Sequence, residues 1–277
     1  MTGLELSASD RERFDRTIRL AEVGEAGQRR LLASTVAVVG AGGLGSAAIL
    51  YLVAAGVGHL RIADSERLEP SNLNRQVIHR ASGLGRLKAE SARDAVLALN
   101  PACQVEIVTD RITEASAGPL LGGADLALDC TDNFRTRLLV ADACWRAGVP
   151  LVTAAVLRFE GQLLSVIPPA RHGESSLDSE ALDGPAATGS PCYRCLVPEE
   201  PPAEASPGAV QVGILGAVAG TMGALQALEA VKVILGIGEN LAHRMLVWDG
   251  LRGTFRTVRR TRDPACRWCG AGGRDRR

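Results

Sequence analysis

A glycine-rich turn directly after a short apolar strand is the feature that most constrains this fold. Val36–Val39 is such a strand, and a helical pattern follows over Ser46–Ala55. Four glycines lie in the turn between them: Gly40, Gly42, Gly43 and Gly45. Glycines let the backbone approach a phosphate, and the next helix directs its N–H groups and dipole at it. An acid at the end of the second strand, Asp64, has the spacing of one that bonds a ribose hydroxyl. The segment therefore predicts nucleotide binding; a turn that only packs helix on strand is the alternative.

Short β-branched runs alternate with helical stretches in the N-terminal part of the chain, which predicts a parallel sheet. Further strands are expected at His59–Asp64, Cys103–Val108, Leu126–Asp129 and Leu151–Thr153, and further helices at Lys88–Asn100 and Arg135–Ala147. After Arg158 the pattern predicts an antiparallel strand at Gly161–Ile167, loops at Pro169–Pro191 and Val197–Pro207, and a hairpin of Met245–Trp248 with Thr254–Val258. The fold class is therefore α/β: a Rossmann-like, doubly wound, mostly parallel sheet with a C-terminal antiparallel extension. One domain over residues 1–277 is expected, with a nucleotide-binding core over 13–165.

Composition limits the partners and the compartment. The 277 residues are 46% hydrophobic, enough for a sizeable core. Thirty-one basic residues balance 31 acidic ones, so no global field favours nucleic acid or an anionic membrane. Met1–Arg16 lacks the apolar segment of a secretion signal. Seven cysteines, four of them in C-x-x-C pairs, suit a reducing compartment, and a cytoplasmic protein is expected.

One uncharged stretch, Val210–Leu228, has nearly the length of a membrane span and contains a G-x-x-x-G pair at Gly216 and Gly220. Gln211, Thr221 and Gln226 interrupt it, and charged residues follow in the same helical pattern. A buried helix of a large α/β domain has this composition too. We therefore expect a core helix and no membrane span.

A cluster of polar and cationic residues follows Asp64. Ser71, Asn72 and Arg75 lie in one segment, and Lys88 begins the next predicted helix. Arg75 could orient phosphate oxygens, Asn72 could hold a ribose or phosphate oxygen, and Lys88 would be a second cation. Singly each is typical of a solvated surface, but together they predict a site for a triphosphate.

Polar residues also follow the strand Leu126–Asp129. Asp132 and Asn133 come after it, and ligands of open parallel sheets bind outside the carboxyl ends of the strands. A carboxylate beside a triphosphate is suited to hold Mg²⁺, so Asp132 is the candidate magnesium ligand. Capping of the next helix by Thr131 or Asp132 is the alternative, and both roles can coexist.

Two C-x-x-C pairs form the most specific chemical pattern: Cys192 with Cys195, and Cys266 with Cys269. Four thiolates can bind Zn²⁺ tetrahedrally and leave no open position for catalysis, so a structural zinc site is predicted. A thioredoxin-like redox pair needs only one such unit, beside a βαβ motif. Cys103, Cys130 and Cys144 are expected to be core residues, and His79 to be solvated or structural.

The order of these motifs resembles the MoeB/ThiF/HesA adenylyltransferases, bacterial relatives of ubiquitin-activating enzymes. The resemblance spans about Arg13 to Gly270 and rests on the following: Arg13-Phe14-Asp15-Arg16, Gly24 with Gly27-Gln28, the Gly40 turn, Asp64, Ser71 to Gln76, Gly85 with Lys88, Asp129 to Asn133, and the two C-x-x-C pairs. It implies an enzyme that uses ATP and Mg²⁺ to adenylate the C-terminal glycine of a small ubiquitin-like sulfur-carrier protein, releasing pyrophosphate. It also implies that residues 166–277 form the carrier-binding and zinc-containing part.

The resemblance assigns roles to particular residues. Gly43 would lie at the phosphates, Asp64 at the ribose, Asp132 near Mg²⁺, and three residues at the triphosphate: Asn72, Arg75 and Lys88. Arg16 matches an arginine that reaches the nucleotide of the neighbouring subunit, which implies a homodimer with shared sites. The catalytic set is therefore Arg16, Arg75, Lys88 and Asp132.

Two departures from the family pattern affect the expected chemistry. Many relatives carry a cysteine before the long apolar helix, whereas 206–210 contains none, so no covalent cysteine intermediate is expected. The chain ends soon after Gly270, without room for the rhodanese domain of some relatives, so a separate sulfur donor is expected. Thr17 stands where a glutamine is usual.

Two other functions remain compatible with parts of the sequence. An NAD(P)-dependent oxidoreductase would use the glycine turn and Asp64 but leaves Arg75 and Lys88 without a role. A non-catalytic, zinc-stabilised scaffold for a carrier protein would use only the cysteines and the loops. The first predicts nicotinamide binding, and the second predicts carrier binding that ATP does not affect.

Overall fold

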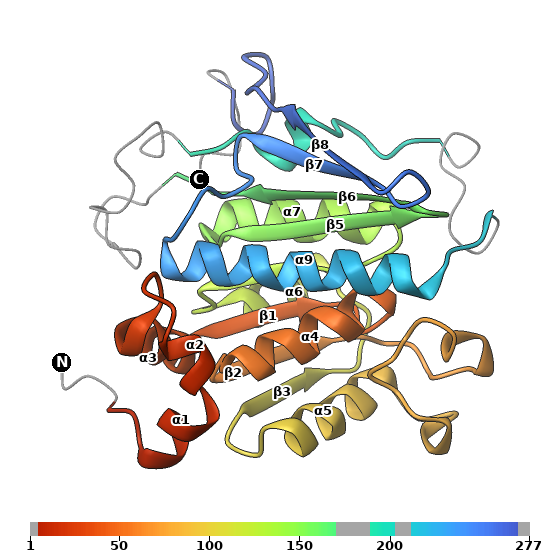
Figure 1. The fold of residues 1–277 in the computed structure, drawn as a ribbon. Helices are drawn as coiled ribbons and strands as arrows, with labels where there is room; N and C mark the ends of the chain where they lie inside the picture. The colour runs from red at the N-terminus through yellow and green to blue at the C-terminus, as the bar shows by residue number, and fades with distance from the viewer. Residues whose placement is uncertain (1–4, 170–188, 203–211, 271–277) are drawn as a thin grey trace.

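The computed structural model describes residues 5–169, 189–202 and 212–270 and shows a central sheet flanked by helices (Figure 1). The described strands form one eight-stranded sheet in the order β3-β2-β1-β4-β5-β6-β7-β8. Their bounds are β1 Thr35–Val39, β2 His59–Ala63, β3 Gln104–Val108, β4 Leu126–Asp129, β5 Leu151–Leu157, β6 Glu160–Val166, β7 Arg244–Asp249 and β8 Thr254–Arg259. Strands β1 to β5 pair in parallel, and β6, β7 and β8 pair antiparallel. This confirms the doubly wound fold with an antiparallel extension.

Helices cover both faces of the sheet, because the central strands β1 and β4 are buried and apolar on both sides. Val36, Val38 and Leu128 pack with α4 (Gly43–Ala55), α5 (Lys88–Leu99) and α9 (Gly216–Leu235) in one core. The alternating residues Ala37 and Val39 pack with α6 (Glu114–Leu121) and α7 (Phe134–Ala147) in the other. The N-terminal helices α1 (Ala8–Arg13), α2 (Asp15–Ile18) and α3 (Gly24–Ala33) lie at one end of the sheet (Figure 1).

The long apolar helix α9 is a core helix of this fold. It is long and apolar enough to span a membrane, but 61% of its apolar window is buried inside the protein. A Cβ at Gly223 would overlap the carbonyl oxygen of Leu44, so glycine permits the close contact between α9 and α4. The Gln226 side chain donates to the carbonyl oxygens of Asp129 (2.8 Å) and Val152 (3.0 Å) and so ties α9 to β4 and β5. Gln226, one of the polar residues that interrupt the apolar run, therefore packs inside the protein, and the expected core helix is confirmed.

The structure corrects several boundaries. Helix α9 begins at Gly216 and reaches Leu235, whereas Val210 and Gln211 lie outside the described residues. Helix α6 was not predicted; it is short, contains Pro119 and begins with a capping box between Thr113 and Ser116. Strand β5 extends to Leu157 because it pairs with β6 beyond the parallel sheet. Most of the two predicted loops, 170–188 and 203–207, also falls outside the described residues.

Candidate active site

A cavity of about 620 Å³ opens at the carboxyl ends of the parallel strands. Its walls include most of the residues expected to bind the nucleotide: Gly40, Gly42, Gly43, Asp64, Arg75, Lys88, Asp132 and Asn133. Residues from β5 and β6, among them Gln162, and from the segment before α9, among them Ile214, close the opposite side. The sheet topology thus brings together groups that are far apart in sequence.

The glycine turn has the conformation that its composition predicts. Gly40 has a φ of 96°, and a Cβ there would lie 2.9 Å from the carbonyl oxygen of Cys130. A Cβ at Gly45 would overlap the carbonyl oxygen of Gly40. The backbone is therefore packed against itself and against β4, and α4 begins at Gly43 with its N-terminus at the cavity. This arrangement is suited to an anion, because the first N–H groups of a helix have no partner within it.

His79 supports the turn from behind. Its ring Nε2 lies 2.9 Å from the carbonyl oxygen of Ala41 and its Nδ1 lies 2.9 Å from the hydroxyl of Ser91. Burial lowers the pKa of His79, which favours the neutral imidazole. The structural role expected for this histidine is confirmed.

Asp64 connects the end of β2 to the same turn. Its Oδ2 accepts the N–H of Ala41 at 2.8 Å, and its Oδ1 accepts the N–H of Glu66 at 2.9 Å. Burial raises the pKa of Asp64, although both backbone hydrogen bonds oppose that shift. The carboxylate lies at the cavity wall, where the ribose contact remains a prediction.

The two cations of the predicted triphosphate site both line the cavity. The Lys88 side chain is only 4% exposed, and its Nζ lies 2.5 Å from Oε2 of Glu66, a residue whose own side chain is 71% exposed. Arg75 donates from Nη1 to the carbonyl oxygen of Ser71 at 2.9 Å and to Oδ1 of Asn74 at 3.1 Å. Lys88 is therefore a buried ammonium, and its exposed partner Glu66 could move into solvent when a ligand binds to Lys88.

Two members of the predicted cluster support the site from outside its walls. Asn72 is buried, and its Oδ1 accepts the N–H of Glu69 at 3.0 Å, which closes the 3₁₀ turn Pro70–Asn72. Ser71 is exposed and offers its carbonyl oxygen to Arg75. Neither is among the cavity-lining residues, so direct nucleotide contacts by both stay predictions.

At the end of β4, the structure separates the roles of neighbouring polar residues. Asp132 is exposed and lines the cavity, where it could hold Mg²⁺. Asn133 caps α7, since its Oδ1 accepts the N–H of Thr136 at 2.9 Å. The alternative that Thr131 or Asp132 caps this helix is wrong, because α7 begins at Phe134 and Asn133, directly before it, occupies the N-cap position.

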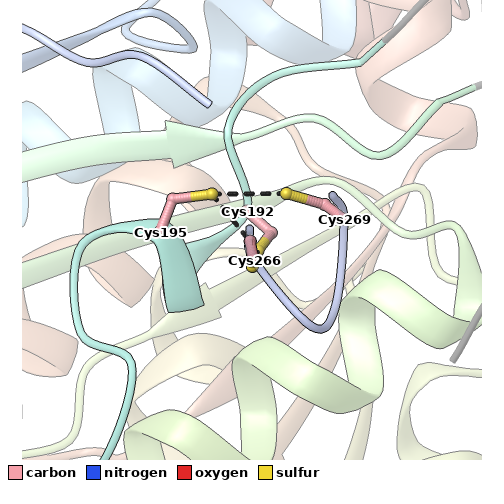
Figure 2. Close-up of side chains that lie close together, drawn as sticks. All are labelled: Cys192, Cys195, Cys266 and Cys269. Atoms are coloured by element: carbon pink, nitrogen blue, oxygen red, sulfur yellow. Dashed lines mark hydrogen bonds between the residues drawn. The ribbon is translucent and has the colours of Figure 1, made fainter. Parts of the chain in front are cut away.

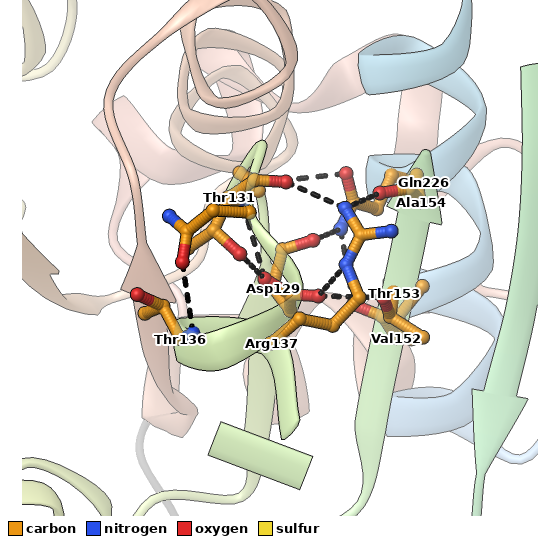
Figure 3. Close-up of polar contacts among 10 residues, drawn as sticks. Asp129, Thr131, Thr136, Arg137, Val152, Thr153, Ala154 and Gln226 are labelled. Carbon is orange, nitrogen blue, oxygen red and sulfur yellow. Dashed lines mark hydrogen bonds and ion pairs between the residues drawn. The ribbon is translucent and has the colours of Figure 1, made fainter. Parts of the chain in front are cut away.

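A buried ion pair fixes this strand end (Figure 3). Asp129 is fully buried, and its Oδ2 lies 3.1 Å from Nε of Arg137 and accepts the hydroxyl of Thr153 at 2.7 Å. Arg137 donates from Nη2 to the carbonyl oxygens of Thr131 (2.5 Å) and Ala154 (3.0 Å). Arg137 thereby joins the ends of β4 and β5, and its side chain lines the cavity.

Arg16 does not reach this cavity within the chain. Its side chain is 89% exposed and lies 3.8 Å from Oδ2 of Asp15. The structure therefore gives Arg16 no nucleotide contact inside one subunit, and its predicted role depends on a partner subunit.

Several cavity residues were not predicted as site residues from the sequence. Gln76 is 4% exposed, and its Oε1 has no hydrogen-bond partner among the described residues. It follows Arg75 directly, so its position in the sequence could have identified it as a site residue. Glu66 follows Asp64 by two residues, as a second acid at the same strand end. Asp110 and Arg111 follow β3 and could have been found from the strand-end rule.

The four C-x-x-C sulfurs form a compact cluster (Figure 2). All four Sγ atoms lie within 4.8 Å of one another, with Cys195–Cys269 at 3.3 Å, Cys192–Cys266 at 3.6 Å and Cys192–Cys195 at 3.9 Å. Sulfurs in a tetrahedral zinc site lie about 3.8 Å apart, given Zn–S bonds of about 2.3 Å. The donor set and spacing fit a closed structural Zn²⁺ site.

This sulfur cluster is tied firmly to the sheet and to α7. Arg260 is buried and donates to the carbonyl oxygens of Ser165 (2.8 Å) and Pro191 (3.0 Å). Arg194 donates to both carboxylate oxygens of Asp142, at 3.0 and 2.6 Å. These contacts anchor the first C-x-x-C pair on one side, through Arg194 and Pro191.

The other three cysteines are buried, as expected. Burial raises the pKa of Cys103 to about 11 and raises the pKa of both Cys130 and Cys144 well above the ordinary value of a thiol. Cys130 lines the cavity, and its thiol contacts Oε1 of Gln226 at 3.4 Å. A raised pKa disfavours the thiolate, so the geometry gives Cys130 no nucleophilic character.

Comparison with known proteins gives the relationship. The ThiF family profile matches residues 14–268. A relative from Haloferax volcanii named SAMP-activating enzyme E1 is 43% identical over 272 residues, which cover 98% of this chain and 93% of that protein. The sulfur carrier protein adenylyltransferase of Thermus thermophilus is 42% identical, covering 94% and 90%. The Bos taurus adenylyltransferase and sulfurtransferase MOCS3 is 44% identical, and the chain spans about half of its length, 54%.

Solved structures support the same fold. The microcin C7 biosynthetic enzyme MccB, solved in complex with N-formylated MccA, superimposes with a TM-score of 0.76 at 20% identity, over 95% of this chain and 76% of that one. The family predicted from the glycine turn, the cationic cluster and the cysteine pairs is therefore confirmed. This chain belongs to the ThiF family, and the relatives named above include adenylyltransferases.

Proposed function

We propose that this protein uses ATP and Mg²⁺ to adenylate the C-terminal glycine carboxylate of a small ubiquitin-like sulfur-carrier protein, releasing pyrophosphate. The observation that carries the proposal is the composition of the cavity: Lys88, Arg75 and the N-terminus of α4 face one space together with Asp132. A nicotinamide dinucleotide would need no such set of cations. The names of the relatives from Haloferax volcanii and Thermus thermophilus support a carrier protein as the substrate.

The chain's residues have the chemistry that this reaction requires. The carboxylate of the carrier is already a nucleophile, so no side-chain base is needed, and the enzyme has to align it with the α-phosphate. Lys88 and Arg75 would stabilise the charge that develops on the departing pyrophosphate. Asp132 would hold the magnesium ion, which neutralises phosphate charge when it is bound. Asp64 and the glycine turn would fix the nucleoside and the phosphate backbone.

We also propose a homodimer in which Arg16 completes the partner's site. Arg16 is exposed and outside its own cavity. The outer face of α9 carries Leu228, which is 56% exposed, close to the half-buried Leu225. An apolar helix face of this kind is suited to bury against a second copy.

The remaining parts of the proposal concern organisation and sulfur transfer. Residues 1–277 form one adenylation domain, with a nucleotide-binding core at 13–165 and carrier and zinc functions at 166–277, in the cytoplasm. Residues 206–210, which lie outside the described residues, contain no cysteine, so we expect adenylation without a covalent cysteine intermediate. A separate protein would donate the sulfur.

Carrier-dependent ATP–pyrophosphate exchange tests the proposal. Arg75→Ala and Asp132→Ala should each abolish exchange while the circular dichroism spectrum and the zinc content stay unchanged. Arg80→Ala is the matched control, because Arg80 is exposed in the same segment and does not line the cavity. Undiminished exchange in both cavity variants would refute the assignment of the site. Carrier binding that is independent of ATP, without any exchange, would favour the scaffold.

A further inference from the structure

The zinc cluster and the nucleotide cavity share a connection through α7. Tyr193 lies between the metal-binding residues Cys192 and Cys195 and is 5% exposed. The Tyr193 hydroxyl lies within reach of the Arg137 guanidinium, where the 3₁₀ turn Tyr193–Cys195 packs against α7. Arg137 is itself 7% exposed and lines the nucleotide cavity. Tyr193 therefore belongs to the segment that carries two of the four cysteines and also contacts a residue in the wall of the cavity.

Arg137 controls the backbone that presents the proposed magnesium ligand. Its Nη2 donates to the carbonyl oxygen of Thr131 at 2.5 Å, and Thr131 directly precedes Asp132. The Thr131 N–H and hydroxyl are also held, by Oδ1 of Asp129 at 3.0 and 2.6 Å. Figure 3 shows that these contacts converge on the turn after β4. A shift of the guanidinium would therefore move the backbone from which the Asp132 side chain extends.

The metal would determine how rigidly Tyr193 is held. Four bonds to one ion would fix the segment Cys192–Cys195 against Cys266 and Cys269, whereas four thiols offer each other only weak hydrogen bonds. Arg194 and Asp142 anchor the segment on the other side, so loss of the metal would loosen the Tyr193 end without detaching it. A buried arginine keeps a fixed position only while its N–H groups have partners.

We propose that Tyr193 is a positioning residue that couples the Cys₄ metal site to the nucleotide cavity, by holding Arg137 and through it the turn that carries Asp132. The inference rests on the proposed function only for the identity of the ligand, Mg·ATP. It gives the zinc site a role in nucleotide binding in addition to its role in folding.

The test uses Tyr193→Phe, which removes the hydroxyl and keeps the buried ring. The variant should retain wild-type zinc content but bind Mg·ATP more weakly by calorimetry, by at most about fivefold to tenfold, the limit set by the loss of one polar contact that acts on the site through Arg137. Tyr51→Phe is the matched control, since Tyr51 is the only other tyrosine and its side chain is exposed. Wild-type affinity in Tyr193→Phe with zinc retained would overturn the coupling.

Two measurements separate coupling from a merely structural role. Because coupling between two binding sites is reciprocal, Mg·ATP should raise the zinc affinity of the wild type and of Tyr51→Phe, measured at equilibrium in competition with a chromogenic chelator, and should raise it less in Tyr193→Phe. Identical zinc affinity with and without Mg·ATP in the wild type would overturn the proposal even if Tyr193→Phe failed to fold.

The second measurement needs no nucleotide. Amide hydrogen exchange of 130–134 should speed up in Tyr193→Phe and on zinc removal from the wild type, while β1 stays protected. Unchanged exchange at 130–134 in the zinc-free wild type would overturn the coupling. Failure of the wild type to bind Mg·ATP would count against the proposed function. The amide hydrogen exchange of 130–134 would still decide whether the metal site and the cavity are coupled.

Discussion

Lys88→Met separates the catalytic role of a buried ammonium from its role in stability. Lys88 is almost fully buried, yet its partner Glu66 is 71% exposed. If Lys88 contacts the triphosphate, its loss removes a charge-assisted hydrogen bond worth about 1.5–3 kcal/mol. That range corresponds to about 10- to 150-fold in kcat/KM, and removal of an electrostatic group that acts in the transition state raises the loss to about 10²–10³-fold.

Stability should change little in the same variant. Glu66 returns to solvent when Lys88 is removed, so no charge is left buried without a partner. Ion pairs with an exposed member contribute about 0–1 kcal/mol, and methionine retains the packing of the methylene chain. We expect the free energy of unfolding of Lys88→Met to stay within about 1 kcal/mol of the wild type.

Lys232, the only other lysine, should show the opposite behaviour: its loss should lower stability and leave activity unchanged. Lys232 donates at 2.6 Å to Glu229, which is 2% exposed and also accepts from Ser165 and from the N–H of Leu241. Lys232→Met leaves that carboxylate buried with one partner fewer and should cost about 1–3 kcal/mol of stability, with pyrophosphate exchange unchanged. Denaturant unfolding and carrier-dependent exchange on both variants check the pair. If Lys88→Met lowers the rate of pyrophosphate exchange by less than about threefold, the role assigned to Lys88 is refuted.

Three other predictions follow from the packing of the site. Gly45→Ala should destabilise the protein by about 1–3 kcal/mol and weaken Mg·ATP binding in calorimetry, because the added Cβ would overlap the Gly40 carbonyl oxygen. Gly118→Ala, where the added Cβ meets open space, should be tolerated, and equal effects of the two substitutions would contradict the turn geometry. Burial lowers the pKa of His79 below its unfolded value of about 6.5, so the free energy of unfolding should fall as the pH drops below about 6.5 toward the folded pKa. His79→Gln should make the free energy of unfolding depend less on pH in denaturant titrations, and a pH dependence as steep as that of the wild type would count against this role of His79. Cys195→Ser should reduce bound zinc, measured by elemental analysis, and lower the melting temperature, whereas Cys103→Ser should retain full zinc; equal zinc in both would argue against the Cys₄ site.

Much of the fold could be predicted because its signals are local. Strand β1 is apolar on both faces, and the strand–turn–helix pattern around Gly40 fixes the first βα unit. Helix α6 was missed because eight residues with an internal proline carry too weak a periodicity. The start of α9 was misplaced because apolar residues upstream of Gly216 continue the composition without continuing the helix.

The site was predictable in its parts and less so in its connections. Spacing after Asp64 identified Arg75 and Lys88, which the cavity brings together. It could not distinguish Asn72, which closes its own turn, from a ligand contact, because both roles use the same side-chain amide. Nor could it reveal that Arg137 joins β4 to β5, since that contact depends on tertiary packing between strand ends.

Intact-mass analysis of a carrier protein after incubation with this enzyme and Mg·ATP tests the central claim most directly. A small ubiquitin-like carrier with a free C-terminal glycine should gain the mass of one adenylate, with pyrophosphate released in equal amount. Deletion of that glycine should abolish both signals, and no adduct with the enzyme should be released by a reducing agent. A carrier of unchanged mass for every candidate tested, or a thioester or disulfide to Cys130, would contradict adenylation without covalent capture.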